Sequence, residues 1–492
     1  MIDETPGPDI DRVITAAQVA AEALATTTPA ERARWLMATA DALDKAAADL
    51  IPVAVRETRL PEHPRLHSEL VRTVFQLRLF ARVLEDGEFL DAAVDHADPD
   101  WPMGPRPDIR RAMVPMGPVL VFTASNFPFA LSVAGHDTAS ALAAGCPVVV
   151  KAHPGHPELS ARTGDVVAEA LARAGAPAGT FGMIAGVQAG VTALRHPAIA
   201  AASFTGSAAG GRALFDIANA RPRPIPFYGE LGSVNPVLVT PGAVRKRGRE
   251  IVEGFVGSFT LGAGQFCTKP GLLLLPAGHG LDETLRGAVE SVSAQAMLNE
   301  RIADGYLAGV DRLREHPCIT VLSGPELGDD PFRPTLLKVA AADFTRAAAE
   351  LGAECFGPTS LIIEYDGDAE LRAVLDALEP GLTATVHAQD SETERVRALL
   401  PTLTRLAGRL LWNGWPTGIT LSWAQQHGGP YPATTAPGFT SMGTAAIARF
   451  LRPVAWQGFP DALLPPALRE DNPWALPRRI DGIRVTGEEN ER

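Results

Sequence analysis

The sequence has few cysteines and no long apolar run. Among its 492 residues there are four cysteines, Cys146, Cys267, Cys318 and Cys355, which lie far apart and show no paired metal-ligand spacing. This spacing argues against a zinc site and against a disulfide scaffold, and it is typical of a reducing compartment. No apolar run approaches the roughly 20 residues that a membrane span needs, and the first ten residues lack the apolar core of a signal peptide. We therefore expect a cytoplasmic protein with no metal ion and no membrane partner.

Positive charge is also scarce. The 44 lysines and arginines are outnumbered by 57 aspartates and glutamates, which gives a formal net charge of −13. This balance argues against a general nucleic-acid-binding surface, although it leaves room for a local basic pocket. The hydrophobic content of 46% and the charged content of 21% are those of a globular protein, and the length suits two or three domains. We expect no nucleic-acid partner.

Short apolar strands alternate with helices in the first half of the chain. The expected strands are Val119–Phe122, Pro147–Val150, Phe181–Ala185 and Ala200–Phe204. Fully apolar runs of this length suit a parallel sheet that is covered on both faces. Ser160 is expected to cap the helix after the second strand, and the alternation resumes after Cys267. Alternation at this pitch predicts a doubly wound α/β domain.

Helices are expected before these strands. Thr28 and Pro29 are typical of a helix start, because threonine can cap a helix and proline suits its first turn. Another helix is expected over residues 66–85, where apolar residues recur at helical spacing. Arg72 and Gln76 fall outside the apolar face of that helix. From the pattern alone, a solvated polar face is the simplest interpretation of these two residues.

Residues 262–271, GAGQFCTKPG, place one cysteine among small and polar residues. Gly262 and Gly264 allow close backbone approaches, and Pro270 ends the segment with a fixed φ and no N–H donor. The segment would make a poor core strand and a plausible loop for a nucleophile. Two interpretations stand at this point: Cys267 is a reactive thiol, or it is a small buried hydrophobic residue, as most free cysteines are.

Two further segments carry residues of chemical interest. The expected fourth strand runs into FTGSAAGG, from Phe204 to Gly211, and then into a helix. Free amides and the helix dipole make such a turn either a phosphate site or a simple tight connection, and the usual fingerprint of three spaced glycines is absent. Glu230 follows the apolar segment FYG. It is either paired with an arginine or, with a pKa raised by partial burial, a general base.

Seven stretches together resemble the aldehyde dehydrogenase superfamily, in the family's order and over nearly the whole chain. They are ASNFPFA, VVVKAHP, FTGSAAGG, FYGELGSVNP, GQFCTKPG, ECFGP and NGWPTG. The resemblance implies an aldehyde dehydrogenase-like α/β fold with a doubly wound dinucleotide-binding domain (residues 1–100 and 119–230) and a catalytic domain (231–440). The remaining residues, 101–118 and 441–492, would form a bridging and oligomerisation element. The family also implies a homo-dimer or homo-tetramer.

The resemblance implies roles for particular residues. Cys267 would attack the aldehyde carbon as a thiolate, giving a thiohemiacetal and, after hydride transfer, a thioester. The Asn126 amide and the Cys267 backbone N–H would hold the oxyanion, and Glu230 would activate the water that hydrolyses the thioester. The implied cofactor-binding residues are Lys151, Gly206, Ser207, Gly211, Glu354 and Phe356. Loss of Cys267, Asn126 or Glu230 would have favoured a non-catalytic nucleotide-binding homologue, but all three are present.

One departure from the family concerns the cofactor. Many NAD-preferring relatives have a glutamate three residues after the lysine, where it binds the ribose 2′-hydroxyl. Here that position is Pro154, flanked by His153 and His156. No carboxylate at this position repels a 2′-phosphate, and an imidazole such as that of His153 could donate a hydrogen bond to it. We therefore expect NADP as the preferred cofactor, with NAD also used.

Further motifs resemble the branch of the family that oxidises α-ketoglutarate semialdehyde (2,5-dioxopentanoate). They are KAHPGHP, RTVFQLRLFA, HGGPYPATT and the tail RFLRPVAWQGFPDALLPPAL. This small-molecule aldehyde has a distal carboxylate, for which the resemblance offers Arg72, with Gln76 one turn along the same helix. The alternatives are a broad-specificity or succinate semialdehyde dehydrogenase. A CoA-acylating relative is disfavoured, because Glu230 favours water as the acceptor.

Overall fold

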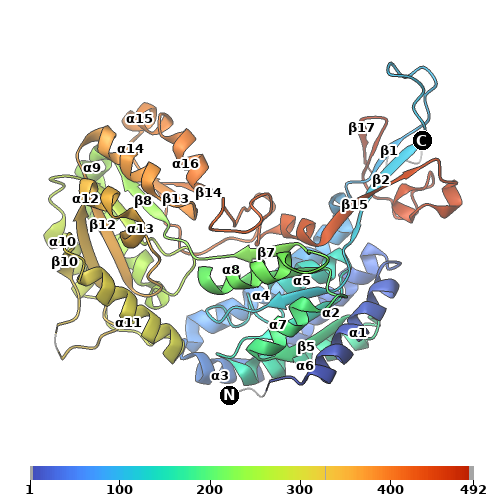
Figure 1. Cartoon of the computed structure of the whole chain (residues 1–492), viewed down its shortest axis with the longest axis horizontal. Helices are drawn as coiled ribbons and strands as arrows, with labels where there is room; N and C mark the ends of the chain where they lie inside the picture. The colour runs from blue at the N-terminus through green and yellow to red at the C-terminus, as the bar shows by residue number, and fades with distance from the viewer. Residues whose placement is uncertain (1–3, 327, 487–492) are drawn as a thin grey trace.

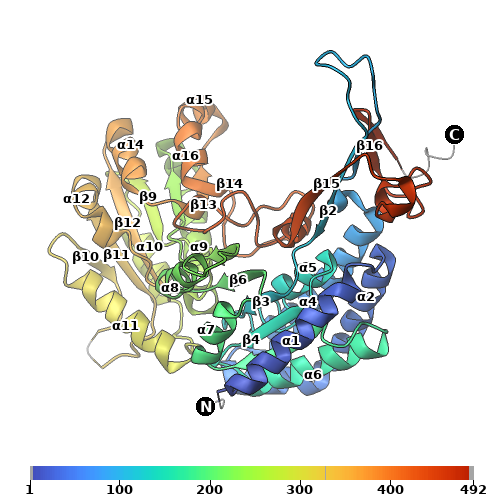
Figure 2. The same cartoon turned by 45° about the vertical axis from the view of Figure 1, so that its right-hand side comes forward.

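Three β-sheets organise the protein. The computed structural model describes residues 4–326 and 328–486. Figures 1 and 2 show two bodies in which helices pack on sheets, and a thinner arm that projects away from one of them. Among the described helices, none is both long enough and apolar enough to cross a membrane.

The first sheet has five parallel strands in the order β5-β4-β3-β6-β7. They are β3 (Val119–Phe122), β4 (Val148–Ala152), β5 (Phe181–Ala185), β6 (Ala201–Thr205) and β7 (Phe227–Glu230). Every residue of β3 and β4 is buried, as their apolar sequences predict for a sheet covered on both faces. The strand order reverses between β3 and β6, and ligands bind beside such a reversal in open α/β sheets.

Helices cover both faces of this sheet. One face packs against α2 (Pro29–Lys45), α3 (Ala47–Thr58), α4 (His67–Asp86), α5 (His136–Ala144) and α6 (Pro157–Arg173). The other face packs against α1 (Gly7–Leu24), α7 (Val187–Arg195) and α8 (Ala208–Asn219). A turn of π-helix, η1 (Glu62–Leu66), joins α3 to α4. The two covered faces confirm the doubly wound arrangement.

The helix starts show which local signals were reliable. At α2, the Thr28 hydroxyl accepts from the Glu31 N–H and the Glu31 carboxylate accepts from the Thr28 N–H, so the expected start is confirmed. At α6, the expectation that Ser160 caps the helix is wrong. The helix begins at Pro157, and the Ser160 hydroxyl donates back to the His156 carbonyl oxygen from inside the first turn. Proline suits the first helical position and sets the start there.

The second sheet has seven strands in the order β10-β11-β12-β9-β8-β13-β14, all parallel to their neighbours except β10. They are β8 (Pro236–Val239), β9 (Leu272–Pro276), β10 (Thr320–Ser323), β11 (Thr335–Ala340), β12 (Thr359–Tyr365), β13 (Gly381–His387) and β14 (Ala407–Trp412). One face packs against α9 (Pro241–Thr260) and α10 (Asp282–Glu290). The other packs against α11 (Glu300–Arg314), α12 (Ala341–Arg346), α13 (Ala348–Leu351), α14 (Gly367–Ala377), α15 (Thr393–Arg397) and α16 (Leu400–Leu406).

The third sheet forms the arm. Its order is β15-β2-β1-β16-β17, which joins chain segments more than 300 residues apart. The strands are β1 (Ala93–Asp95), β2 (Ile109–Pro115), β15 (Leu451–Gln457), β16 (Arg478–Ile480) and β17 (Ile483–Val485). The segment between β1 and β2 extends beyond the sheet at the far end of the arm (Figures 1 and 2).

The expected fold class is confirmed by these sheets. Of the two segments expected to form a bridging element, residues 101–118 contain strand β2, and residues 441–492 contribute β15, which pairs with β2. The division of the chain into three domains stays a prediction.

Candidate active site

Cys267 lies in a loop that hydrogen bonds from another segment hold in place. This Cys267 loop (residues 265–270) follows α9 and a short helix, η3 (Leu261–Gly264). Gly264 at the end of η3 has a φ of +65°, and a Cβ there would lie 2.2 Å from the Gly357 carbonyl oxygen, so only glycine fits. The Asn235 amide donates to the carbonyl oxygens of Cys267 (2.8 Å) and Lys269 (3.0 Å). The loop therefore presents a partly exposed thiol in a fixed position.

An imidazole links the expected nucleophile to the expected base. Nε2 of His427 lies 3.5 Å from Sγ of Cys267 and 2.9 Å from Oε1 of Glu230. The Ser441 hydroxyl donates to the other Glu230 oxygen, and Glu230 is buried at the end of β7. His427 was not among the residues for which the sequence predicted a role. It stands in the motif HGGPYP, but no spacing rule links it to residues 160 and 197 positions away.

The three groups shift one another's protonation. Burial raises the pKa of the Cys267 thiol well above its usual value, and the neighbouring Glu230 carboxylate adds to the rise. Burial also acts to raise the pKa of Glu230, but the His427 charge and hydrogen bonds from His427 and Ser441 outweigh it and lower that pKa. The expectation of a raised Glu230 pKa is therefore wrong. The resting site pairs a neutral thiol with a carboxylate.

Asn126 approaches the Cys267 loop from the first sheet. It stands in the segment after β3, and its side-chain amide donates to the Gln265 carbonyl oxygen (3.1 Å). Its own carbonyl oxygen accepts from the Arg65 guanidinium (2.8 Å). Asn126, Glu230 and Cys267 line the same cavity. The structure thus brings together the three residues for which the sequence predicted catalytic roles.

This main cavity has a volume of about 340 Å³. Its lining includes five of the expected cofactor residues, namely His153, Gly206, Ser207, Glu354 and Phe356. Ser207 caps α8, since its hydroxyl accepts from the Gly210 N–H (3.3 Å), and a Cβ at Gly206 would lie 2.7 Å from the Phe204 ring. A glycine turn at a helix N-terminus, a carboxylate and an aromatic ring in one cavity fit a dinucleotide.

Two other expected cofactor residues lie outside this lining. Lys151 is buried at the end of β4, where burial and the nearby Arg301 charge lower its pKa to about 8. Gly211 lies within α8, and a Cβ there would lie 2.1 Å from the Leu231 side chain. Glycine at position 211 therefore serves the packing of α8, and contact with a pyrophosphate stays a prediction.

The two histidines beside Pro154 differ in what they can offer. The ring of His156 is fully engaged, with Nδ1 3.0 Å from the Ser160 hydroxyl and Nε2 3.2 Å from the Ala124 carbonyl oxygen. In His153, Nδ1 accepts from the Gly155 N–H (3.0 Å), so the proton of the neutral ring is on Nε2. Burial lowers the pKa of His153 well below its usual value. His153 can therefore donate one hydrogen bond to a ligand in the main cavity.

A buried lysine ties the segment of Glu354 to the Cys267 loop. Nζ of Lys269 donates to three carbonyl oxygens in residues 355–359, at 2.6 to 3.1 Å. Burial raises the pKa of Glu354 to about 7, while the Lys269 charge opposes the rise. The Glu354 carboxyl group is thus close to half-ionised at neutral pH, in the lining of the main cavity.

A second, smaller cavity of about 20 Å³ also has the sulfur in its wall. Its lining includes Arg72 from α4 and His427, and Cys267 is the one described residue that both linings contain. Arg72 is partly buried, and its Nε has no hydrogen-bond partner in the described part of the chain. A cation with one unpartnered donor therefore shares the lining of this cavity with the thiol.

Gln76 does not share this position. It is fully buried, its amide donates to the Ala130 carbonyl oxygen (3.2 Å), and it is not among the residues that line the smaller cavity. The interpretation of Arg72 and Gln76 as a solvated polar face is therefore wrong for Gln76. Through this hydrogen bond Gln76 contacts Ala130, which is itself one of the lining residues.

Comparisons with known proteins agree with this geometry. The chain matches the aldehyde dehydrogenase family over residues 2–429. It is 47% identical to alpha-ketoglutaric semialdehyde dehydrogenase 2 of Azospirillum brasilense over 96% of this chain and 91% of the relative. It is 42% identical to alpha-ketoglutaric semialdehyde dehydrogenase of Acinetobacter baylyi, again over 96% of this chain and 91% of the relative.

The fold is also that of a solved aldehyde dehydrogenase. A variant of aldehyde dehydrogenase C from Pseudomonas syringae, solved with NAD+ and octanal, superposes with a TM-score of 0.76 at 21% identity, covering 93% of this chain and 90% of that one. The family match, the two relatives and the residues gathered around the thiol all point the same way. The chain belongs to the aldehyde dehydrogenase family, and it is an NAD(P)-dependent enzyme.

Proposed function

We propose that this enzyme oxidises 2,5-dioxopentanoate, the semialdehyde of 2-oxoglutarate, to 2-oxoglutarate. The observation that carries the substrate is the 47% identity, over 96% of the chain, to a relative that is named for this aldehyde. The smaller cavity supports it, because Arg72 and the thiol share its lining. The substrate has an aldehyde at one end for the sulfur and a carboxylate at the other for a cation.

In this proposal Cys267 is the nucleophile. Its sulfur forms a bond to the aldehyde carbon while the thiol proton passes to the pair of His427 and Glu230. The contacts of 3.5 Å and 2.9 Å to His427 Nε2 supply the path. Only a thiolate attacks well, and the raised pKa of the thiol means that its proton must leave as the bond forms. The adduct is a thiohemiacetal that carries an oxyanion.

Two donors would stabilise that oxyanion. The Asn126 amide lines the main cavity beside Cys267, and the Cys267 backbone N–H supplies the second donor. Such donors gain strength as charge develops on the oxygen, and one of them is typically worth about 10² to 10³ in rate. A bound NAD(P)+ would supply the hydride acceptor, and loss of hydride from the adduct carbon would leave a thioester on Cys267.

Glu230 would then serve the hydrolysis. Its lowered pKa keeps the carboxylate ionised at neutral pH, so it can take a proton from the water that attacks the thioester carbon. The C–S bond breaks, the carboxylic acid leaves, and this proton passes to the Cys267 sulfur through His427. The proton first taken from the thiol has by then been released to solvent. The hydrogen bond from Ser441 holds the Glu230 carboxylate during this exchange.

We propose NADP as the preferred cofactor, with NAD also used. Three groups support a site for the 2′-phosphate: Nε2–H of His153, the ammonium of Lys151 and the guanidinium of Arg301. The Arg301 charge contributes to lowering the pKa of both Lys151 and His153. Arg301 itself makes no ion pair with any described residue. Pro154 leaves the position of the family's glutamate without a carboxylate. An extra phosphate would relieve the mutual repulsion of the cations.

Steady-state kinetics on the purified chain test both proposals. We expect kcat/KM to be highest with 2,5-dioxopentanoate, lower with succinate semialdehyde and lowest with uncharged pentanal, and higher with NADP than with NAD. Equal values for the three aldehydes would instead identify a broad-specificity enzyme, and a maximum for succinate semialdehyde would identify that substrate. A large preference for NAD would contradict the proposed 2′-phosphate site.

Iodoacetamide separates an active enzyme from a non-catalytic homologue. We expect it to label Cys267 first, with loss of turnover in proportion. Cys146 and Cys355 are buried, and of the two partly exposed thiols, Cys267 and Cys318, it is Cys267 that has an imidazole 3.5 Å from its sulfur to accept the proton. We also propose that the three sheets mark the predicted domains, that the arm joins copies into a homo-dimer or homo-tetramer, and that the enzyme is cytoplasmic. The four free cysteines support a reducing compartment.

A further inference from the structure

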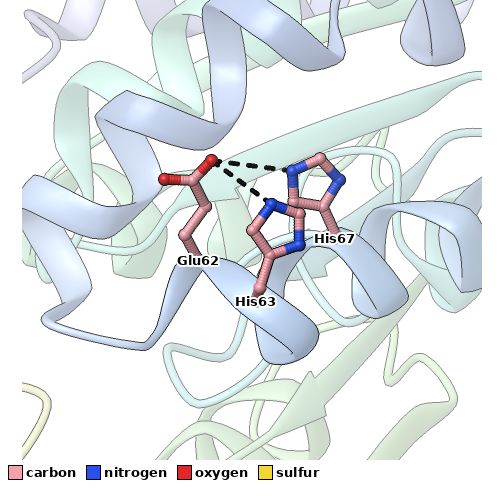
Figure 3. A group of neighbouring side chains, drawn as sticks. All are labelled: Glu62, His63 and His67. Carbon is pink, nitrogen blue, oxygen red and sulfur yellow. Dashed lines mark ion pairs between the residues drawn. The ribbon is translucent and has the colours of Figure 1, made fainter.

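A second group of metal-ligating side chains lies away from the catalytic residues, on η1 and the start of α4. Glu62, His63 and His67 each offer one ligand atom, and these atoms all lie within 4.8 Å of one another. Figure 3 shows the three side chains gathered on this turn. The cysteine spacing had predicted no metal ion, but that prediction did not take these histidines into account.

The described residues contain two other groups of this kind, and neither is comparable. One is the catalytic group of Glu230, Cys267 and His427. In the other, which contains Asp282 and Glu364, Nζ of Lys338 lies 2.6 Å and 3.6 Å from the two carboxylates. A resident ammonium group already balances those charges. Only the η1 group combines uncommitted ligands with a position outside the active site.

The two imidazoles already face one carboxylate oxygen. Nε2 of His63 and Nε2 of His67 each lie 3.7 Å from Oε1 of Glu62, and Figure 3 shows both nitrogens directed at that oxygen. The rings are stacked, with centroids 3.9 Å apart and planes 11° apart. Two ligand atoms on one tetrahedral Zn²⁺ at about 2.0–2.1 Å stand roughly 3.3 Å from each other. The ligand atoms are therefore close enough to reach one ion, and closing around it needs shorter contacts and a rotation of the two exposed rings out of their stacked arrangement.

Exposure and charge also suit a metal ion. The side chains of Glu62, His63 and His67 are 55%, 70% and 43% exposed, so an ion can reach them and water can complete its coordination. No lysine or arginine in the described ranges forms an ion pair with Glu62. Two neutral imidazoles and one carboxylate favour Zn²⁺, Ni²⁺, Co²⁺ or Cu²⁺ over Mg²⁺ and Ca²⁺, which prefer ligand sets made of oxygen.

The segment that carries these ligands also supports the active site. Arg65 lies between them, donates to the Asn126 carbonyl oxygen (2.8 Å) and forms an ion pair with Glu69. The Glu69 carboxylate accepts in turn from the N–H groups of Phe129 and Ala130 (2.8 and 2.9 Å), just beyond Asn126. An ion bound at positions 62, 63 and 67 would fasten both ends of the segment that holds Arg65.

We propose that Glu62, His63 and His67 bind a divalent transition-metal ion of the Zn²⁺ and Ni²⁺ class, and that the ion fastens residues 62–67 beside the Asn126 segment. The site is independent of which aldehyde the enzyme oxidises. Its ligands come from one turn of chain, so the folded protein presents them together.

Isothermal titration calorimetry tests this site on the full chain after treatment with a chelator. The protein carries Cys267→Ala, which removes the thiol of the catalytic group. We expect ZnCl₂ and NiCl₂ each to bind at one ion per chain, and MgCl₂ to give no saturable heat. Adding His63→Gln and His67→Gln should weaken Zn²⁺ and Ni²⁺ binding at least tenfold, since even loss of a second-shell partner costs about 10- to 100-fold.

The matched control is His96→Gln in the same Cys267→Ala background. His96 is another exposed histidine beside carboxylates, 2.7 Å from Asp481 and 3.3 Å from Glu470 on the arm, and its loss should leave the affinity unchanged. Ni²⁺ should also raise the unfolding midpoint of Cys267→Ala but not that of the His63/His67 double variant. Binding that survives the double substitution, or no saturable binding of either ion, would overturn the proposal.

Discussion

At the scale of single residues, His427 holds the position on which the proposed proton transfer depends. Its Nε2 contacts both the Cys267 sulfur and the Glu230 carboxylate, while its Nδ1 has no hydrogen-bond partner among the described residues. The ring can therefore pass a proton between sulfur and carboxylate, but no described side chain fixes its second nitrogen. Orientation of the ring depends on the backbone of its own loop, where the His427 N–H donates to the Thr440 hydroxyl (2.9 Å).

Replacing His427 with glutamine should lower kcat by about 10²- to 10⁴-fold, the usual range for a lost acid–base group. The KM for the cofactor should change little. The rate of alkylation by iodoacetamide should fall as well, because the thiol proton loses its acceptor. Ser441→Ala is the matched control, since it removes one hydrogen bond to Glu230 and leaves the imidazole in place; its kcat should fall less than tenfold. A His427→Gln enzyme with near-normal kcat would exclude this role.

Arg72 is predicted to select the substrate by its charge. Arg72→Ala should raise the KM for 2,5-dioxopentanoate at least tenfold, because a buried Arg–carboxylate pair is lost, and should change the KM for pentanal far less. Arg78→Ala is the control on the same helix, since Arg78 is exposed and pairs with Asp41 at 2.8 Å. Equal changes for both aldehydes would remove Arg72 from the substrate site. Steady-state kinetics of the two variants make this comparison.

Glu354 is predicted to make stability depend on pH. Its pKa is about 7 in the folded chain against a usual value of 4.5, so the folded state binds this proton more tightly than the unfolded state. Wild-type stability is therefore lost as pH rises from about 4.5 to 7. Glu354→Gln should be more stable than wild type by about 3 kcal/mol at pH 8 and by less than about 1 kcal/mol at pH 5.

Denaturant unfolding at the two pH values measures this difference. The control is Glu379→Gln, which changes an exposed glutamate that forms no ion pair with any described residue and should shift stability equally at both pH values. A Glu354→Gln difference that stays constant between pH 5 and pH 8 would contradict the raised pKa.

At the scale of secondary-structure elements, the sequence predicted which segments form strands but not which strands become neighbours. Apolar runs such as Val119–Phe122 identify a strand because a sheet covered on both faces buries every side chain. β12 pairs with β9, and β13 with β8, across long stretches of intervening chain, and no local pattern encodes either pairing. Local signals also compete, which is why Pro157 and not Ser160 determines the start of α6.

The same limit applies to the site. Cys267 and Glu230 could be predicted because each stands in a segment of unusual local composition, whereas the role of Asn126 was implied by the resemblance to the family. His427 and Arg301 could not, because their relation to the thiol and to Lys151 arises only when separate elements pack together. Lys269 stands in the motif TKPG and is apparent in the sequence. Its hydrogen bonds to carbonyl oxygens in residues 355–359 could not be predicted, because that segment is distant in the sequence.

Lys269→Met should loosen that connection between loops. Three carbonyl oxygens in residues 355–359 would lose their donor, and leaving buried acceptors unsatisfied costs about 1 to 3 kcal/mol each before relaxation. We expect a loss of at least 3 kcal/mol in unfolding free energy and a higher KM for the cofactor, because Glu354 precedes the released segment. Lys338→Met, at a partly exposed ion pair, should cost about 1 kcal/mol or less. Equal losses in the two variants would contradict this view of Lys269.

At the scale of the whole molecule, the arm has strand edges and apolar side chains that the rest of the described chain does not cover. Strands β15 and β17 are both open edges of a five-stranded sheet. In the segment between β1 and β2, Trp101 and Met103 are 43% and 91% exposed. Exposed apolar side chains beside open strand edges are typical of a protein–protein contact, which agrees with the proposed homo-oligomer.

The double variant Trp101→Ser, Met103→Ser should therefore weaken self-association. We expect sedimentation velocity at micromolar concentration to show a smaller species than wild type, with an unchanged far-ultraviolet circular dichroism spectrum. Val19→Ser, at an exposed apolar residue of α1, is the control and should sediment as wild type does. A wild-type chain that sediments as a monomer would rule out the arm as an interface between copies.

The sulfur is a wall shared by two cavities, one with the expected cofactor residues and one with Arg72. In the proposed mechanism the cofactor and the aldehyde would therefore reach the sulfur from different cavities. The reduced dinucleotide could then leave the main cavity while the acyl group remains attached to Cys267. Water would reach the thioester from that cavity, which Glu230 also lines, so the mechanism predicts that the reduced cofactor is released before the carboxylic acid.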